Sequence, residues 1–305
     1  MKISINNPVY LNEIGRRSNQ EDSIYPEIGQ ATTESKIFIV CDGMGGHEHG
    51  EVASQTVCDT LSNYINSHWD GGYFSDDLLF DALQATICQI NKLDDDSVRK
   101  PGTTMTFLCL HRGGVLVAHI GDSRIYHIRP SEQSILYKSR DHSLVYDLFL
   151  AGEITQEEMT TYDKKNVLTR AILPNMDREP KADIVHITDV QAGDYFVLCT
   201  DGLLEKMSDQ ELIGLFIKNS SNEEKCQDLL QMTQENADNH SAYIIQIRDI
   251  EAEEGDEQLI NDEAITKSNA VLLEIAGKVD KRPIKHSIFR KLFGFISSYL
   301  FLCTF

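Results

Sequence analysis

The sequence has little positive charge for its length and no paired cysteine motif. Among its 305 residues, 28 lysines and arginines stand against 48 aspartates and glutamates, which gives a formal net charge of -20. Proteins that bind nucleic acid need a basic surface for the phosphate backbone, so we expect no nucleic-acid partner. The seven cysteines form no Cys-x-x-Cys pair. An odd, unpatterned set of this kind is typical of reduced thiols in a cytoplasmic protein.

Several other signatures are absent, and each absence argues against a class of protein. There is no His-Glu-x-x-His, no His-x-x-x-His and no cysteine-rich ligand set, which argues against a zinc centre. There is no Gly-x-Ser-x-Gly segment and no Gly-x-x-x-x-Gly-Lys-Ser/Thr loop, so serine hydrolases and nucleotide-binding proteins of the P-loop type find no support. Residues 1–10 contain no long apolar core, so we expect no secretory leader.

An apolar stretch that ends in an aspartate and glycines is the most informative feature that is present. Residues 37–41 are rich in β-branched and aromatic side chains, which predicts a buried strand with Asp42 at its C-terminal end. The glycines that begin at Gly43 permit a sharp turn and a close approach to a ligand. Taken alone, this pattern is an ordinary solvated turn. It recurs at 198–202, however, where a second apolar strand ends in Asp201 and a glycine.

Two more acidic turns lie near the ends of the same region, and we expect all these carboxylates to converge. One turn contains Glu21 and Asp22, and the other contains Asp238. Hard divalent cations such as Mg²⁺ and Mn²⁺ prefer oxygen ligands and keep several waters, so a few carboxylates on rigid supports can bind them. The residues alone therefore predict an acidic metal site in a domain of mixed α and β structure.

Helical signals occur in several segments between these turns. Apolar residues at helical spacing, among them Val52 and Val57, predict a helix over 51–69 with one face directed inward. Ser75 is the expected N-cap of a second helix. Capping-box patterns that begin at Thr155 and Ser208 predict two more helix starts.

Strand signals separate the helical segments. Apolar stretches predict a hairpin over 104–120 and further strands at 125–128, 135–138, 184–187, 195–200 and 242–247. A helical segment at about 143–166 interrupts this series. Because inserted segments of this kind often carry function, we expect it to form a mobile flap over a site.

The C-terminal part of the chain differs in composition from the rest. Residues 249–263 form a dense acidic run that predicts a disordered linker, so the main domain is expected to cover 1–248. In the tail, 264–305, a basic cluster precedes an apolar end that is too short for the roughly 20 residues of a membrane span. It could lie on an anionic membrane, which predicts a cytoplasmic protein at the inner membrane surface, or pack on protein instead.

A series of short motifs occurs in an order shared by one enzyme family. The motifs are 17–22 (RSNQED), 40–47 (VCDGMGGH), 102–105 (GTTM), 119–124 (HIGDSR), 141–143 (DHS), 168–171 (LTRA), 199–203 (CTDGL) and 238–241 (DNHS). Over about residues 8–248 the chain thereby resembles the metal-dependent protein phosphatases, the type 2C serine/threonine phosphatases, and their bacterial branch in particular. The resemblance implies an α+β fold, a four-layer α-β-β-α sandwich of two antiparallel sheets flanked by helices.

The same resemblance implies two Mn²⁺ or Mg²⁺ ions in each active site, with a third ion bound more loosely. Asp42 matches the residue that bridges the two ions. Glu21 and the carbonyl group of Gly43 would bind one of them. Asp201 and Asp238 would bind the other.

Three further residues receive roles from the resemblance. Asp22 would act mainly through metal-bound water, Asp122 would help to bind the third ion, and Arg17 would bind the substrate phosphate. The implied reaction is hydrolysis of phosphoserine and phosphothreonine by in-line attack of a metal-bridging hydroxide. Eukaryotic members carry a histidine, a proposed general acid, where this chain has Met44. Methionine cannot donate a proton, so the proton for the leaving group must come from metal-bound water or from another group.

Two functions remain open from the sequence. The first is an active phosphatase that acts on phosphorylated proteins and opposes a serine/threonine kinase. The second is a catalytically weak pseudophosphatase that serves as a metal-binding interaction module. The complete set of carboxylates favours the enzyme. A membrane-surface adaptor driven by the tail is compatible with either function.

Overall fold

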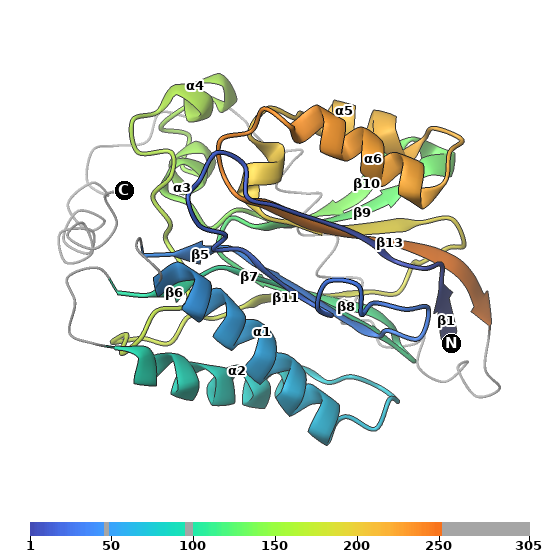
Figure 1. Cartoon of the computed structure of the whole chain (residues 1–305), viewed down its shortest axis with the longest axis horizontal. Coiled ribbons are helices and arrows are strands. Elements are labelled where there is room, and N and C mark those ends of the chain that lie inside the picture. The colour runs from blue at the N-terminus through green and yellow to red at the C-terminus, as the bar shows by residue number, and fades with distance from the viewer. Residues whose placement is uncertain (46–48, 95–99, 252–305) are drawn as a thin grey trace. The chain divides into compact units, whose positions relative to one another are not determined.

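The structure, a computed structural model, describes residues 1–45, 49–94 and 100–251. In this part of the chain, two antiparallel sheets form the centre of the fold (Figure 1). One sheet has the strand order β1 (Lys2–Ile5), β13 (His240–Glu251), β12 (Tyr195–Cys199), β9 (Arg124–Arg129) and β10 (Ser134–Lys138), and β2 (Val9–Glu13) also pairs with β13. The other has the order β11 (Asp183–Ile187), β8 (Gly114–Ile120), β7 (Met105–His111), β4 (Ile37–Cys41) and β3 (Ser23–Tyr25).

Helices cover the outer faces of both sheets. The sheet that contains β4 packs against α1 (His49–His68) and α2 (Asp76–Ile90), and the sheet that contains β12 packs against α5 (Asp209–Phe216) and α6 (Asn222–Thr233). The predicted α-β-β-α sandwich is therefore confirmed. The remaining elements are short: α3 (Leu144–Leu150), α4 (Gln156–Thr161), the 3-10 helices η1 (Asn91–Leu93), η2 (Pro130–Glu132) and η3 (Asp201–Leu204), and the strand pair β5 (Gly43–Met44) with β6 (Gly102–Thr103).

The alternation of side chains along the strands produces three apolar layers. Along β4, Ile37 and Ile39 belong to the cluster under α1 and α2, whereas Phe38 and Val40 belong to the cluster between the sheets. Strand β12 divides its residues in the same way between the central layer and the layer under α5 and α6. Both strands are buried along their whole length, so each one gives the acidic residue that follows it a rigid support.

Most of the local predictions are confirmed. Ser75 caps α2, and Thr155 and Ser208 form complete capping boxes at the starts of α4 and α5. The inward position of Val52 is wrong, because its side chain is 46% exposed and lies beside the buried stripe of α1. The segment proposed as a flap does contain two helices, α3 and α4. Among the described residues, no helix combines the length and apolar content needed to cross a membrane.

Candidate metal centre

In the sheet that contains β12, which we call the first sheet, the strand register brings three aspartates to the same end of the strands. Cys199, the last residue of β12, pairs with Arg124 of β9 on one side and with Ala242 of β13 on the other. Because these pairs are antiparallel, the end of β12 meets the start of each neighbour. The acidic residues that flank these three positions are Asp122, Asp201 and Asp238. The sheet therefore assembles them from turns that are far apart in the sequence.

The second sheet, which contains β4, contributes Asp22 and Asp42 at the same end of the fold. Ser23 of β3 pairs with Cys41 of β4, so the aspartates next to this pair are neighbours. The backbone of Asp42 is held on both sides, because its N–H donates to Thr104 Oγ1 (3.0 Å) and its carbonyl oxygen accepts from Thr103 Oγ1 (2.8 Å). These bonds hold the backbone of Asp42 while its carboxylate faces the other acids.

The aspartates disturb one another electrostatically. Burial, together with the charges of Asp22 and Asp201, raises the pKa of Asp42 well above its usual range. Burial also raises the pKa of Asp22 to about 8, although hydrogen bonds from Ser241 and Thr200 oppose the shift. A bound cation would offset the energetic cost of burying these carboxylates, and it would reduce the repulsion between them. The cluster thus has the electrostatic character of a cation site.

The donor set fits a hard divalent ion. Asp22 Oδ2 accepts a hydrogen bond from Thr200 (3.0 Å), but Asp22 Oδ1 is buried and has no partner among the described residues. All the converging side chains offer carboxylate oxygens, the ligands that Mn²⁺ and Mg²⁺ prefer. Asp42 and Asp122 are partly exposed and Asp201 is exposed, so ions and substrate can reach the cluster from solvent.

The loop between β2 and β3 contributes the other two predicted residues. Arg17 donates to Asp238 Oδ2 (2.8 Å), and this bond is the main reason why the pKa of Arg17 is raised. The carbonyl oxygen of Glu21 accepts from the N–H of Gly43 (3.1 Å), which places these two residues side by side. A Cβ atom on Gly50 would lie 2.9 Å from Glu21 Oε2, so the Glu21 carboxylate lies against the first turn of α1.

A second group of side chains of metal-binding types lies next to the turn that carries Asp122. His119, His142 and Asp183 place ligand atoms within 4.8 Å of one another. The N–H of Gly121 donates to His142 Nδ1 (3.1 Å), and His142 Nε2 faces both Asp183 Oδ2 (3.1 Å) and Arg170 Nη1 (3.2 Å). Metal-bound histidines usually donate from their second nitrogen, and His142 cannot. We interpret this group as a hydrogen-bonded support of the turn.

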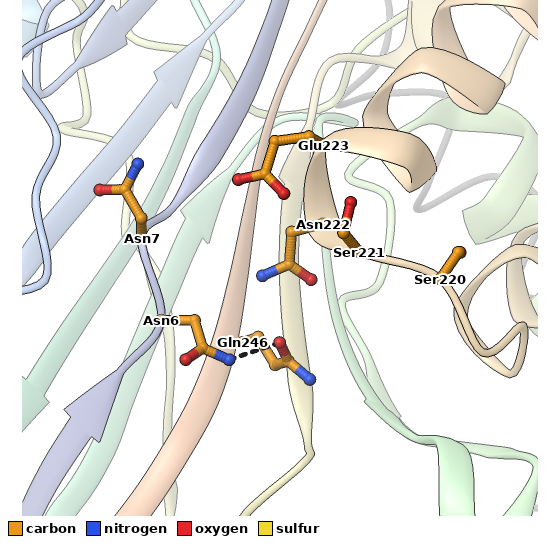
Figure 2. Close-up of a pocket in the computed structure, with 7 residues that line it drawn as sticks. All are labelled: Asn6, Asn7, Ser220, Ser221, Asn222, Glu223 and Gln246. Atoms are coloured by element: carbon orange, nitrogen blue, oxygen red, sulfur yellow. Dashed lines mark hydrogen bonds between the residues drawn. The ribbon is translucent and has the colours of Figure 1, made fainter.

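A polar pocket of about 270 Å³ lies at the other end of the first sheet (Figure 2). Gln246 lines the pocket and pairs with Tyr195, the first residue of β12. Asp201, in contrast, lies two residues beyond Cys199, the last residue of the same strand. Asn222 in this pocket accepts a hydrogen bond from the hydroxyl group of Tyr195 (3.0 Å). The other lining side chains are amides, hydroxyls and the carboxylate of Glu223. The pocket is thus remote from the aspartate cluster.

Comparisons with known proteins agree with this geometry. The family model described as Protein phosphatase 2C matches residues 13–243. The chain belongs to this family. Protein phosphatase PhpP of Streptococcus pneumoniae is 32% identical over 205 residues, which cover 66% of this chain and 80% of PhpP. The crystal structure of the Mycobacterium tuberculosis serine/threonine phosphatase PstP/Ppp matches with a TM-score of 0.68 at 26% identity and covers 81% of this chain and 100% of that one.

Because the chain belongs to the type 2C phosphatase family, its activity is known. It is a metal-dependent serine/threonine protein phosphatase of the bacterial type, a phosphoric monoester hydrolase whose substrates are phosphorylated proteins. The family binds divalent metals. One matching structure, at a TM-score of 0.67 and 26% identity, is the catalytic domain of PstP in complex with two manganese ions. It covers 81% of this chain and 100% of that one.

The side chain of Met44 packs on a neighbouring strand and offers no proton to a leaving group. Met44 lies in β5 and pairs with Gly102 of β6. A Cβ atom on Gly102 would lie 3.2 Å from Met44 Cγ, so the methionine side chain packs on that strand. His47 lies outside the described residues.

Several residues that support the site were not identified from the sequence. Thr104 binds both the N–H of Asp42 and the hydroxyl group of Ser123 (2.6 Å), next to Asp122. Asn239 binds the backbone of Glu21. Ser123 and Asn239 each stand directly after an aspartate in a motif, which is a weak local signal, whereas Thr104 lies in a motif without an acidic residue. Their partners became evident only from the fold.

Proposed function

We propose that Asp42, Asp201 and Asp238, together with Glu21 and the carbonyl group of Gly43, hold two Mn²⁺ or Mg²⁺ ions. The observation that carries this proposal is the position of Asp42, where both sheets end and where burial, together with the neighbouring carboxylates, raises its pKa. From that position Asp42 would bridge the two ions. Glu21 and Gly43, which are neighbours through their backbones, would bind one ion. Asp201 and Asp238 would bind the other.

The remaining polar residues would complete the site. Asp22, whose buried Oδ1 has no hydrogen-bond partner among the described residues, would act through water bound to an ion. Asp122 would contribute to a third, looser ion. When bound, such ions lower the pKa of water and neutralise charge on the phosphoryl oxygens. Arg17 would bind the substrate phosphate, because its planar fork can donate two hydrogen bonds to phosphate oxygens.

Hydrolysis assays test this assignment directly. The full chain is assayed with p-nitrophenyl phosphate and with a phosphothreonine peptide, in Mn²⁺ and in EDTA. We expect turnover only with Mn²⁺, and we expect Asp42→Ala and Asp201→Ala to reduce it to background. Asp59→Ala, on the exposed face of α1, is the matched control and should retain activity. Full activity of Asp42→Ala would contradict the assignment.

Domain organisation and cellular context are also proposed. The domain of about residues 1–248 carries catalysis, 249–263 is an acidic linker, and 264–305 is a tail. The compact unit that ends at Glu251 supports this division. The tail and most of the linker lie outside the described residues. A cytoplasmic phosphatase that opposes a serine/threonine kinase, with its basic tail on the inner membrane surface, would fit the family and the composition of the tail.

A further inference from the structure

Asn239 follows Asp238 directly and connects it to a distant loop. Its side chain is buried, with 5% of its surface exposed. The Nδ2 group donates to the carbonyl oxygens of Ile14 (2.8 Å) and Asn19 (2.9 Å). The Oδ1 atom accepts from the backbone N–H of Glu21 (2.8 Å). Both amide hydrogens and the amide oxygen are therefore engaged with the loop that joins β2 to β3.

The backbone of Asn239 also orients the carboxylate of Asp238. The N–H of Asn239 donates to Asp238 Oδ1 (2.8 Å). The loop and this turn are also in close backbone contact, because a Cβ atom on Gly15 would lie 2.2 Å from the carbonyl oxygen of Asp238. Gly15 has a φ of +61°, which a glycine adopts without strain. Asn239 thus fixes the position of Asp238 relative to a loop packed tightly against it.

The connection continues from Asn239 into the second sheet. The carbonyl oxygen of Glu21, whose N–H binds Asn239, accepts from the N–H of Gly43 next to Asp42. This path of hydrogen bonds leads from the start of β13 to the end of β4. In the proposed function, Asp238 serves one metal ion, whereas Glu21 and Gly43 serve the other. Asn239 then contacts the supports of both ions.

We propose that Asn239 is a positioning residue that sets the separation of the two metal positions and holds the loop that carries Arg17. This inference rests on the proposed function, because it takes Glu21 and Asp238 as metal ligands. Removing a hydrogen-bond partner that orients a metal ligand typically costs about 10- to 100-fold in metal affinity or activity. A buried asparagine with only a structural role would lower stability and leave the metal affinity of the folded protein unchanged.

The test measures metal binding without relying on turnover. Mn²⁺ is titrated by calorimetry into the metal-free full chain and into Asn239→Ala, at a temperature where circular dichroism shows both to be folded. We expect Asn239→Ala to raise the Kd for Mn²⁺ about 10- to 100-fold. Wild-type affinity in folded Asn239→Ala overturns the proposal.

A second variant separates the two functions of the side chain. Asn239→Asp keeps an oxygen for the N–H of Glu21 but replaces both donors to Ile14 and Asn19 with a repelling oxygen. The loop that carries Arg17 should shift, so the KM for p-nitrophenyl phosphate should rise by a larger factor than kcat falls. A fall in kcat with unchanged KM contradicts this part of the proposal. Asn239→Asp also keeps the proposal testable if Asn239→Ala fails to fold.

Two further variants complete the design. Asn222, visible in Figure 2, is 8% exposed and hydrogen-bonded but remote from the cluster, so Asn222→Ala is the matched control. It should lower the melting temperature and change the Kd for Mn²⁺ by less than about twofold. An equal loss of affinity in both alanine variants overturns the proposal. Glu21→Gln tests the ligand assignment itself, because wild-type affinity there would refute the proposed function instead.

Discussion

The guanidinium group of Arg17 donates a hydrogen bond of 2.8 Å to the carboxylate of Asp238, although the two residues are 221 positions apart in the sequence. Their side chains are 61% and 40% exposed. Exposed ion pairs of this kind contribute only about 0–1 kcal/mol to stability. The importance of the pair is therefore geometrical. It holds the residue proposed to bind phosphate against a residue proposed to bind metal.

Replacing Arg17 should impair catalysis much more than folding. For Arg17→Ala we expect kcat/KM for p-nitrophenyl phosphate to fall about 10- to 100-fold, which corresponds to the loss of charged hydrogen bonds to phosphate. The free energy of unfolding should change by less than about 1 kcal/mol. Arg16 forms a comparable exposed ion pair with Glu235 and is the matched control. Equal kinetic losses in Arg16→Ala and Arg17→Ala would show that Arg17 has no special role.

Metal removal should destabilise the fold, and neutralising an aspartate should reverse the effect. Burial and neighbouring carboxylates raise the pKa of Asp42, so its charge is unfavourable without a cation. We expect Asp42→Asn to raise the melting temperature in EDTA and to abolish turnover. Mn²⁺ at 100 times its Kd should stabilise the wild type by about 2.7 kcal/mol, with a much smaller effect on the variant. Thermal melts in EDTA and in Mn²⁺ measure both. Equal stabilisation of the two proteins would exclude Asp42 as a ligand.

The sequence predicted the parts of the site that depend on local patterns. Buried strands that end in Asp-Gly, such as the one before Asp42, are recognisable because burial selects β-branched and aromatic residues. Helix starts such as Ser75 were also predictable, because capping needs a particular side chain at one position. The contacts of Asn239 were not, since they join residues more than 200 positions apart through strand registers. The contact of His142 with Asp183 likewise depends on tertiary packing alone.

Acid should weaken the fold through a buried ion pair remote from the metal centre. Burial raises the pKa of Asp194, but hydrogen bonds from His127 and Arg129 outweigh it and bring the pKa to about 2, below its ordinary value of 3.8. A lowered pKa means that the folded state favours the ionised carboxylate. The resulting stability is present above about pH 4 and is lost as the pH falls through about 2.

The variant Asp194→Asn isolates this contribution. It removes the buried partner of Arg129 and leaves only the exposed carboxylates of Asp189 and Glu132 paired with it. The cost at neutral pH should therefore be below the roughly 3–5 kcal/mol of a buried ion pair that loses its only partner. Its unfolding free energy should then fall less steeply than that of the wild type between about pH 4 and pH 2. Denaturant unfolding at several pH values measures both slopes. Parallel slopes would mean that other carboxylates cause the acid sensitivity.

Truncation after Glu251 should separate catalysis from membrane contact. Every residue proposed for the site lies between Arg17 and Asp238, within the compact unit, so the shortened chain should keep the kcat and KM of the full chain. Lys281, Arg282, Lys285, Arg290 and Lys291 lie beyond the cut. Basic residues at an anionic surface contribute about 1 kcal/mol each, an attraction that salt screens. In sedimentation with phosphatidylserine vesicles, only the full chain should therefore enter the pellet, and the fraction in the pellet should fall at high salt. The tail is not an electrostatic membrane anchor if the full chain stays in the supernatant. The same conclusion follows if an equal fraction of the full chain enters the pellet with neutral phosphatidylcholine vesicles.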